Sequence, residues 1–283
     1  MSSKGPHKLA VPLSRSDYTF LQTFLRDRIG HELGEGKEYL VESRLGTLAT
    51  RMELTGVAAV FDCLRRGCEP AIREAVCDAM VTCETSFFRN PSAFDRLRNS
   101  VLPALLESRA DDRKLRIWCA GCSTGQEPYS LAITLLDHFP EAKGWDVRIV
   151  ATDVSEPVLR QAEAGTFSPS EVRRGLSDGL LRTYFTPKSG HYEIGPEVRR
   201  LVRFEKLNLV GPSPFSAEFD LILIRNVLIY FTTAARAEVF RSLRRAIHAD
   251  GYLLLGESET ILGQSDDFTF AADGMDYYRP APS

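Results

Sequence analysis

The chain has 283 residues, of which 43% are hydrophobic and 26% are charged, and its formal net charge is −3. These proportions are close to globular averages and exclude extensive disorder beyond the chain ends. Because the charge is nearly balanced, nothing draws the whole molecule toward nucleic acid, and we expect no nucleic-acid partner. A chain of this length holds one large or two modest domains.

The pattern of apolar residues argues against membrane insertion. No apolar run approaches the roughly 20 residues that a membrane-spanning helix needs, and the longest, residues 221–230, is interrupted by Arg225 and Asn226. Residues 1–13 lack the apolar core of a signal peptide, and we expect residues 1–15 to form a flexible tail. We therefore expect a cytoplasmic protein whose six cysteines are reduced.

Helical spacing dominates the first hundred residues. Apolar residues from Phe20 to Ile29 recur at intervals of three and four, which predicts a helix with one buried face and Ser16 as its N-cap. Similar patterns predict helices around residues 40–48, 57–64 and 72–80. We expect an all-α N-terminal domain over residues 16–90.

Strands and helices alternate from residue 115 onward. Apolar runs predict strands at residues 115–119, 147–152, 219–224 and 252–255. Amphipathic segments predict helices at residues 128–139, 156–164 and 233–248. This alternation predicts an α/β fold, with a parallel sheet covered by helices, over residues 91–283. Segments 191–194 and 201–205, on either side of Gly195-Pro196, predict a small antiparallel β insert at about residues 184–204.

A glycine-rich turn, Cys119-Ala-Gly-Cys-Ser-Thr-Gly-Gln-Glu127, follows the first predicted strand. Gly121 and Gly125 permit a tight turn that presents the amides of a helix N-terminus, which suits a nucleoside-type ligand. Their spacing matches neither the dinucleotide pattern nor a P-loop, and a purely structural turn is the alternative. Cys119 and Cys122 have the CxxC spacing of zinc or redox sites, but without a second pair we expect small turn residues and no metal.

Three further segments carry polar residues suited to ligand binding. Asp153 ends the second predicted strand, where a carboxylate can accept hydrogen bonds from ribose hydroxyls or cap the next helix. Thr85–Arg89 fits no helical period; its arginine suits carboxylate recognition, or the segment is a seam between domains. Asn226 and Tyr230 follow the strand at 219–224, and in so apolar a segment they need a ligand or a polar partner.

Together these segments resemble the chemotaxis receptor methyltransferase (CheR) family, from about Ser16 to Arg279. The resemblance rests on TSFFR at 85–89, CAGCSTGQEPYS at 119–130, ATDVS at 151–155, LNL at 207–209 and RNVLIYF at 225–231. It implies a Rossmann-like class I methyltransferase domain with a small antiparallel insert, preceded by a helical domain. It also implies S-adenosylmethionine as cofactor, S-adenosylhomocysteine as product, and methylation of glutamate side chains on chemoreceptors.

The resemblance implies a set of cofactor-binding residues. Thr85 and Arg89 are expected to contact the methionine part of the cofactor. Glu127 is expected to hold its amino group and Asp153 its ribose. The adenine side is expected to be formed by Asn208, Leu209, Asn226 and Val227. The set is completed by Gly121 in the glycine-rich turn and by Cys83, which stands where many family members have asparagine.

Arg89 and Tyr230 match family positions implicated in catalysis. The acceptor, a glutamate carboxylate with a pKa near roughly 4.3, is already ionised at neutral pH, so alignment of the reactants is enough and no general base is required. Two other functions stay open. One is methyl transfer to a small molecule or a different protein, and the other is a cofactor-binding scaffold that docks on receptors without turnover, which Cys83 favours.

The implied partners are the cytoplasmic domains of methyl-accepting chemoreceptors. We expect the helical domain to dock them, with Arg44 and Arg51 on one side of the second helix; an ordinary solvated face is the alternative. The turn at residues 186–191 has one glycine, whereas relatives that bind a C-terminal receptor pentapeptide tend to have Gly-x-Gly. We therefore expect no dependence on a pentapeptide tether, and a monomer.

Overall fold

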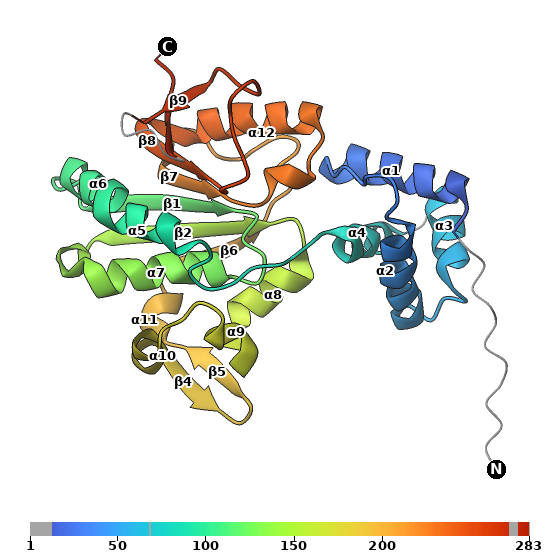
Figure 1. The fold of residues 1–283 in the computed structure, drawn as a ribbon, viewed down its shortest axis with the longest axis horizontal. Coiled ribbons are helices and arrows are strands. Elements are labelled where there is room, and N and C mark those ends of the chain that lie inside the picture. Colours follow the sequence, from blue (N-terminus) through green and yellow to red (C-terminus); the bar gives the residue numbers. More distant parts are fainter. Residues whose placement is uncertain (1–12, 68, 272–276, 283) are drawn as a thin grey trace. The chain divides into compact units, whose positions relative to one another are not determined.

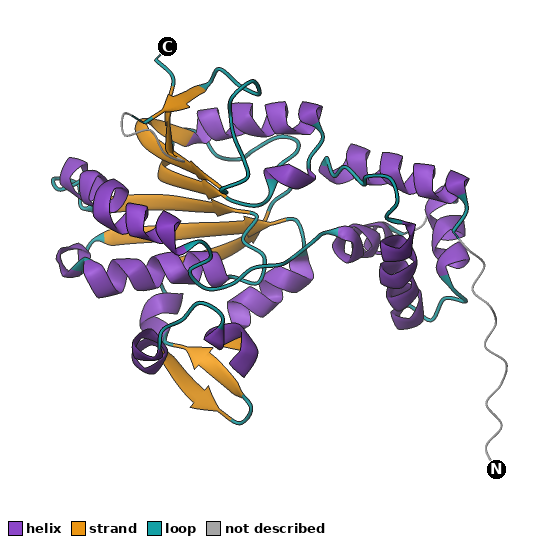
Figure 2. Ribbon diagram, in the orientation of Figure 1, coloured by secondary structure: helices purple, strands orange, loops and turns teal. Residues whose placement is uncertain are grey.

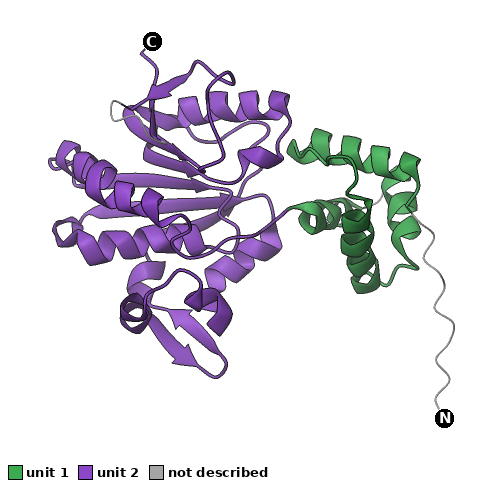
Figure 3. Ribbon diagram, in the orientation of Figure 1, with its two compact units in different colours: residues 1–81 green, residues 82–283 purple. Residues whose placement is uncertain are grey.

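The computed structural model describes residues 13–67, 69–271 and 277–282. The chain forms two compact units, residues 1–81 and residues 82–283 (Figure 3). The first unit is helical, whereas the second combines a large sheet, flanking helices and a small separate sheet (Figures 1 and 2).

The first unit consists of helices α1 (Arg15–Ile29), α2 (Glu38–Arg51), α3 (Val57–Arg65) and α4 (Pro70–Met80). Leu21, Leu25 and Ile29 are buried, which confirms the apolar face predicted for the first helix. The N-cap of α1 is Ser14, whose hydroxyl accepts a hydrogen bond from the Asp17 backbone N–H, so the prediction of Ser16 was wrong. The cap residue must be extended and precede the helix, and Ser16 already lies within it.

Arg44 is engaged within the first unit. Its guanidinium donates hydrogen bonds to the carbonyl oxygens of Met80, at 2.7 Å, and Val81, at 3.0 Å, where α4 ends. Carbonyls at a helix C-terminus have no partner inside the helix and carry the negative end of its dipole, so a cation stabilises them. Arg51 is the exposed member of the arginine pair expected on the second helix.

The large sheet of the second unit has the strand order β6-β2-β1-β7-β8-β10-β9. Its strands are β1 (Lys114–Ala120), β2 (Asp146–Asp153), β6 (Val202–Lys206), β7 (Phe219–Ile224), β8 (Ile247–Leu255), β9 (Phe268–Phe270) and β10 (Tyr277–Pro280). The strands from β6 to β8 pair in parallel, and β10 pairs antiparallel with β8 and β9. This arrangement confirms the predicted Rossmann-like α/β class.

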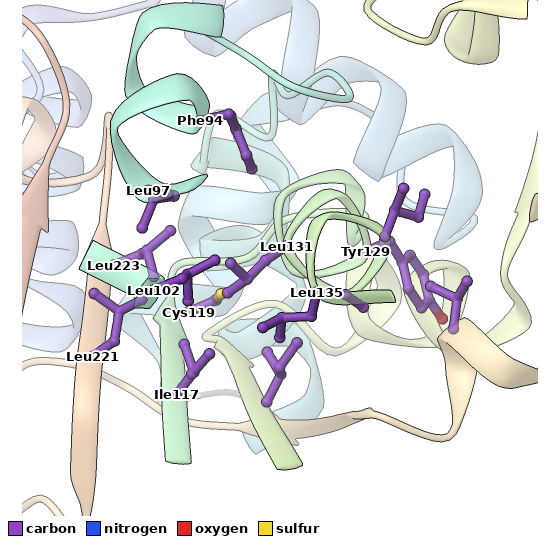
Figure 4. Packing of buried hydrophobic residues seen from close by; sticks show 14 of the residues in the cluster. Phe94, Leu97, Leu102, Ile117, Cys119, Tyr129, Leu131, Leu135, Leu221 and Leu223 are labelled. Atoms are coloured by element: carbon purple, nitrogen blue, oxygen red, sulfur yellow. The ribbon is translucent and has the colours of Figure 1, made fainter. Parts of the chain in front are cut away.

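Helices cover both faces of this sheet (Figure 2). They are α5 (Pro91–Arg96), a π-helical turn (Leu97–Val101), α6 (Leu102–Ser108), α7 (Gln126–His138), α8 (Glu156–Ala164) and α12 (Thr233–Ala246). Successive strand residues point to opposite faces, so Ile117 and Cys119 pack with Leu131 of α7 (Figure 4), whereas Trp118 belongs to the core that contains Phe240 of α12. In the part of the chain described, no helix is both long and apolar enough to cross a bilayer.

The small antiparallel sheet differs from the predicted insert. Its strands are β3 (Thr166–Phe167), β4 (Phe185–Lys188) and β5 (His191–Ile194), and its helices are α9 (Pro169–Arg173), α10 (Asp178–Tyr184) and α11 (Pro196–Arg199). Residues 201–205 were wrongly predicted as a strand of the insert, because β6 pairs in parallel with β2. Gly195-Pro196 begins α11 with proline in its first turn, where a missing N–H is harmless. The chain therefore leaves the insert through a helix and returns to the large sheet.

Candidate cofactor site and active site

The candidate site lies where three parallel strands end. β1 and β2 run side by side, as do β1 and β7, so the residues that follow them emerge at one edge of the sheet, where open α/β sheets bind their ligands. The backbone N–H groups of Gly121 and Cys122 both donate to the carbonyl oxygen of Thr152, at 2.8 and 2.9 Å. The glycine-rich turn is thereby fixed beside the end of β2.

Asp153 joins the two loops at this edge. Its Oδ2 accepts a hydrogen bond from the backbone N–H of Ser123, at 2.9 Å, and its Oδ1 accepts one from that of Ser155, at 3.0 Å. Ser155 is itself the N-cap residue of α8, so Asp153 is not the cap of that helix. A carboxylate oxygen has two lone-pair positions. The half-buried Asp153 is thus a carboxylate acceptor at the edge of the sheet, the kind of group that can bind ligand hydroxyls.

Glu127, in the first turn of α7, forms an ion pair with Arg225. Glu127 Oε2 lies 2.8 Å from Arg225 Nη1, and the Arg225 side chain is only 1% exposed. Burial raises the pKa of the Glu127 carboxyl, and the charge of Arg225 opposes that rise. Arg225 also donates to the carbonyl oxygen of Arg89, at 2.9 Å, and to Asn90 Oδ1, at 3.1 Å. It therefore holds Glu127 and the end of the TSFFR segment together.

Sequence reasoning missed Arg225 as a site residue. The available signal was an arginine immediately after β7, a strand in which every residue is buried. A charge in such a place has to be paired, because an unpaired buried charge is very unfavourable.

The TSFFR segment is anchored by its aromatic residues. The Phe87 side chain is fully buried, and its ring packs edge-on against Phe167 and Phe185 at centroid distances of 4.9 and 5.4 Å. The Phe88 backbone N–H donates to the Ser130 hydroxyl, at 2.9 Å. The Arg89 guanidinium donates to the carbonyl oxygen of Glu84, at 2.9 Å, and its charge slightly opposes the rise that burial causes in the pKa of Glu127.

Cys83 lies beside the glycine-rich turn, since its carbonyl oxygen accepts a hydrogen bond from the Ser123 hydroxyl at 2.8 Å. Burial raises the pKa of the Cys119 and Cys122 thiols well above the usual range. Such thiols stay protonated at neutral pH and are poor nucleophiles and metal ligands. Across the residues that the structure describes, no three His, Cys, Asp or Glu side chains are grouped as a metal site.

The segment after β6 joins the same edge. The Leu207 backbone N–H donates to the carbonyl oxygen of Asp153, at 2.9 Å, which places Asn208 and Leu209 next to the end of β2. Asn208 Oδ1 accepts a hydrogen bond from the Val210 backbone N–H. The structure therefore brings the expected adenine-side residues of this segment close to the expected ribose ligand.

The loop after β7 contributes Asn226, Val227 and Tyr230 to the candidate site. Val227 lies directly on the glycine-rich turn: a Cβ added to Gly121, whose φ is +76°, would lie 2.5 Å from Val227 Cγ2. Asn226 Oδ1 is buried and accepts no hydrogen bond from the described residues. Tyr230 ends the short helix η3 (Leu228–Tyr230), and its backbone N–H donates to the Val227 carbonyl oxygen.

Family models match both units of the chain. The description "CheR methyltransferase, all-alpha domain" matches residues 16–81, and "CheR methyltransferase, SAM binding domain" matches residues 83–275. The chain belongs to the CheR methyltransferase family. One relative, the chemotaxis protein methyltransferase of Vibrio parahaemolyticus, is 37% identical over 262 residues, which cover 92% of this chain and 94% of the relative. Chemotaxis protein methyltransferase 1 of Pseudomonas aeruginosa is also 37% identical over 262 residues, with 90% and 94% covered.

The chemistry of the site fits the cofactor expected of a CheR protein. Glu127 is a mostly buried carboxylate that can accept an ammonium group. Asp153 is a half-buried carboxylate at the end of β2, and Asn226 presents a buried acceptor oxygen without a partner among the described residues. A buried acceptor of this kind is able to take a hydrogen bond from a ligand or a water molecule. The donor and acceptor groups present are compatible with a ligand such as S-adenosylmethionine, which carries an ammonium group and hydroxyl and amino hydrogen-bond donors.

Proposed function

We propose that this chain transfers the methyl group of S-adenosylmethionine to glutamate side-chain carboxylates on bacterial chemoreceptors, as a monomer in the cytoplasm. Membership of the CheR family supports a chemotaxis methyltransferase. The observation that carries the assignment to this site is the convergence of Glu127, Asp153 and Asn226 on one edge of the parallel sheet. The product would be a glutamate methyl ester.

The cofactor is proposed to lie across the glycine-rich turn. Glu127 would bind its amino group and Asp153 its ribose hydroxyls. Thr85 and Arg89 would contact the methionine part, with Cys83 beside them. The adenine side would be formed by Asn208, Leu209, Asn226 and Val227. S-adenosylmethionine supplies a methyl group that is already activated for transfer.

The protein's own contribution is then orientation. The acceptor carboxylate has a pKa near roughly 4.3 and needs no deprotonation, so we assign no general base. Arg89 would orient the acceptor carboxylate, and the Tyr230 hydroxyl would position its attacking oxygen. Holding reactants in line contributes up to roughly 7–11 kcal/mol in favourable cases, which is the main source of rate enhancement that we propose.

The helical unit is proposed to dock the receptor, with exposed Arg51 contributing to that face. We do not assign Arg44 to the docking face together with Arg51, because the Arg44 guanidinium donates hydrogen bonds to the carbonyl oxygens at the end of α4. We also propose that methylation does not depend on a C-terminal receptor peptide. The turn between β4 and β5 has a single glycine, Gly190, at φ +83°, and one such position shapes the sheet edge differently from a Gly-x-Gly pair.

Incubation of the full chain with methyl-labelled S-adenosylmethionine and receptor-containing membranes tests the assignment. We expect base-labile label on receptor glutamates, and the same label when the receptor C-terminus has been removed. Label on a small molecule instead would reassign the substrate. Cofactor binding without transfer would favour a docking scaffold. Loss of labelling with the truncated receptor would overturn only the tether proposal.

A further inference from the structure

The loop that carries Asn226 and Tyr230 is held by a carboxylate from another part of the chain. Glu259 Oε2 accepts hydrogen bonds from the backbone N–H groups of Asn226, at 2.7 Å, and Gly256, at 2.8 Å. Its Oε1 accepts them from Val227, at 2.9 Å, and Ile229, at 3.3 Å. One carboxylate thus binds the backbone of the loops that follow β7 and β8.

This loop needs such a partner. Asn226 has φ +59°, a left-handed conformation that asparagine tolerates better than most residues but that the surrounding structure still has to stabilise. Val227 is the N-cap of η3 and provides no side-chain cap, so the first N–H groups of that helix require an acceptor from outside. Glu259 provides it, and a negative charge is favourable at a helix N-terminus.

The space around Glu259 is built for this contact. A Cβ on Gly256 would lie 2.6 Å from Glu259 Oε2 and 2.8 Å from the Asn226 backbone nitrogen, so a larger residue would separate the two loops. On its other side the loop is fixed by the close contact of Val227 with Gly121. The backbone from Asn226 to Ile229 is therefore held between the glycine-rich turn and Glu259.

We infer that Glu259 is a positioning residue for cofactor binding, acting through the backbone of Asn226 and Val227. This inference rests on the proposed function, because that function places Asn226 and Val227 against the cofactor. Each oxygen of Glu259 accepts two N–H groups, so glutamine would turn an amide NH2 group toward N–H donors. The same carboxylate fixes the start of η3 and hence the placement of Tyr230.

The test compares Glu259→Gln with Glu257→Gln in the full chain, with S-adenosylhomocysteine titrated by calorimetry. Glu257 is exposed and accepts a long hydrogen bond, 3.3 Å, from the Ser92 hydroxyl, so it is a matched control from the same loop. Hydrogen bonds to a charged group contribute enough that we expect about 10- to 100-fold weaker binding for Glu259→Gln. Binding by Glu257→Gln should be unchanged.

A double variant separates positioning from a general structural role. If Glu259 acts through the Asn226 loop, adding Asn226→Ala to Glu259→Gln should weaken binding by less than the product of the two single effects. Multiplicative effects, or wild-type affinity in a folded Glu259→Gln, would overturn the inference. If Glu259→Gln does not fold, Glu259→Asp is used in its place. Aspartate keeps the negative charge, but its side chain is one methylene group shorter, so its oxygens lie farther from the N–H groups. Wild-type affinity there would overturn the inference equally.

The outcomes distinguish this inference from the function on which it rests. A wild-type chain that does not bind S-adenosylhomocysteine would overturn the proposed function and the inference with it. A wild-type chain that binds but transfers no methyl group to receptors would overturn the proposed reaction alone. Normal binding by Glu259→Gln, together with wild-type methyl transfer, would overturn the positioning role alone.

Discussion

Arg225 and Glu127 form a buried ion pair at 2.8 Å, although they lie on different elements of the second unit. Removing one partner of such a pair leaves an uncompensated buried charge, at a cost of about 3–5 kcal/mol. We expect Arg225→Met to lower the free energy of unfolding by about that amount, as measured by urea denaturation. Arg203→Met is the control, because the Arg203 side chain is 79% exposed and surface pairs contribute about 0–1 kcal/mol.

The double variant Glu127→Gln/Arg225→Met should recover part of the lost stability, since it removes both charges. Equal stability of Arg225→Met and Arg203→Met would contradict the importance of the buried pair.

Asp153→Asn should weaken binding of S-adenosylhomocysteine by about 10- to 100-fold, because an amide offers one acceptor oxygen where two are used. Calorimetry on the purified chain measures this directly. Asp146→Asn is a matched control from the opposite end of the same strand, where Asp146 pairs with Arg116. Unchanged affinity for Asp153→Asn would remove Asp153 from the proposed cofactor site.

Tyr230→Phe should lower the turnover number by about tenfold or more and leave cofactor affinity nearly unchanged, if the hydroxyl positions the acceptor oxygen. Steady-state kinetics with receptor membranes, combined with calorimetry, separate the two effects. Tyr39→Phe, at a tyrosine that is 70% exposed on α2, should change neither quantity. An equal loss of affinity and turnover in Tyr230→Phe would place the hydroxyl on the cofactor instead.

Arg44 and Arg51 should respond differently to charge reversal. Arg44→Glu would set a carboxylate against the carbonyl oxygens at the end of α4 and should lower stability. Arg51→Glu should leave stability unchanged and slow methylation, most clearly at low salt, where surface charges are least screened. Thermal unfolding and the salt dependence of the methylation rate measure the two. A wild-type rate at low salt for Arg51→Glu would locate receptor docking elsewhere.

Because His31 is buried, we expect the stability of the helical unit to fall in acid. Its burial, together with the charges of Lys37 and Arg44, lowers its pKa from 6.5 to about 4. Because the folded-state pKa is depressed, the unfolded chain binds a proton that the folded chain does not as the pH falls below 6.5. Stability contributed by neutral His31 is therefore lost between pH 6.5 and about 4, by up to about 3 kcal/mol.

Urea denaturation of the full chain at pH 7, 6 and 5 measures this loss. His31→Gln should flatten the pH dependence. A pH dependence that persists unchanged in His31→Gln would assign it to other groups.

Local patterns in the sequence predicted much of the fold. Contacts between residues far apart in the sequence could not be predicted from these patterns. The spacing from Phe20 to Ile29 identified a buried helical face, because helical period and burial leave a direct mark on the sequence. The edge strand β6 was misassigned, since its half-exposed residues lack the apolar signal of β7. The motifs predicted that Asp153 and Glu127 belong to one site, and the structure places the segments that carry them after the neighbouring strands β2 and β1. Nothing in the sequence marked Glu259, because its partners are backbone N–H groups that only the folded loops bring together.

Gly175 has a consequence for how this fold can vary. A Cβ at Gly175 would lie 1.8 Å from the carbonyl oxygen of Phe87, so the base of the insert touches the TSFFR segment backbone to backbone. Lengthening the chain near Gly175 would push that segment away from Arg225. By contrast, no atom of the other described residues, chain neighbours aside, lies within 4 Å of a Cβ placed on Gly190, in the exposed turn between β4 and β5. Insertions and fused tags should therefore be tolerated at the tip of the insert but not at its base.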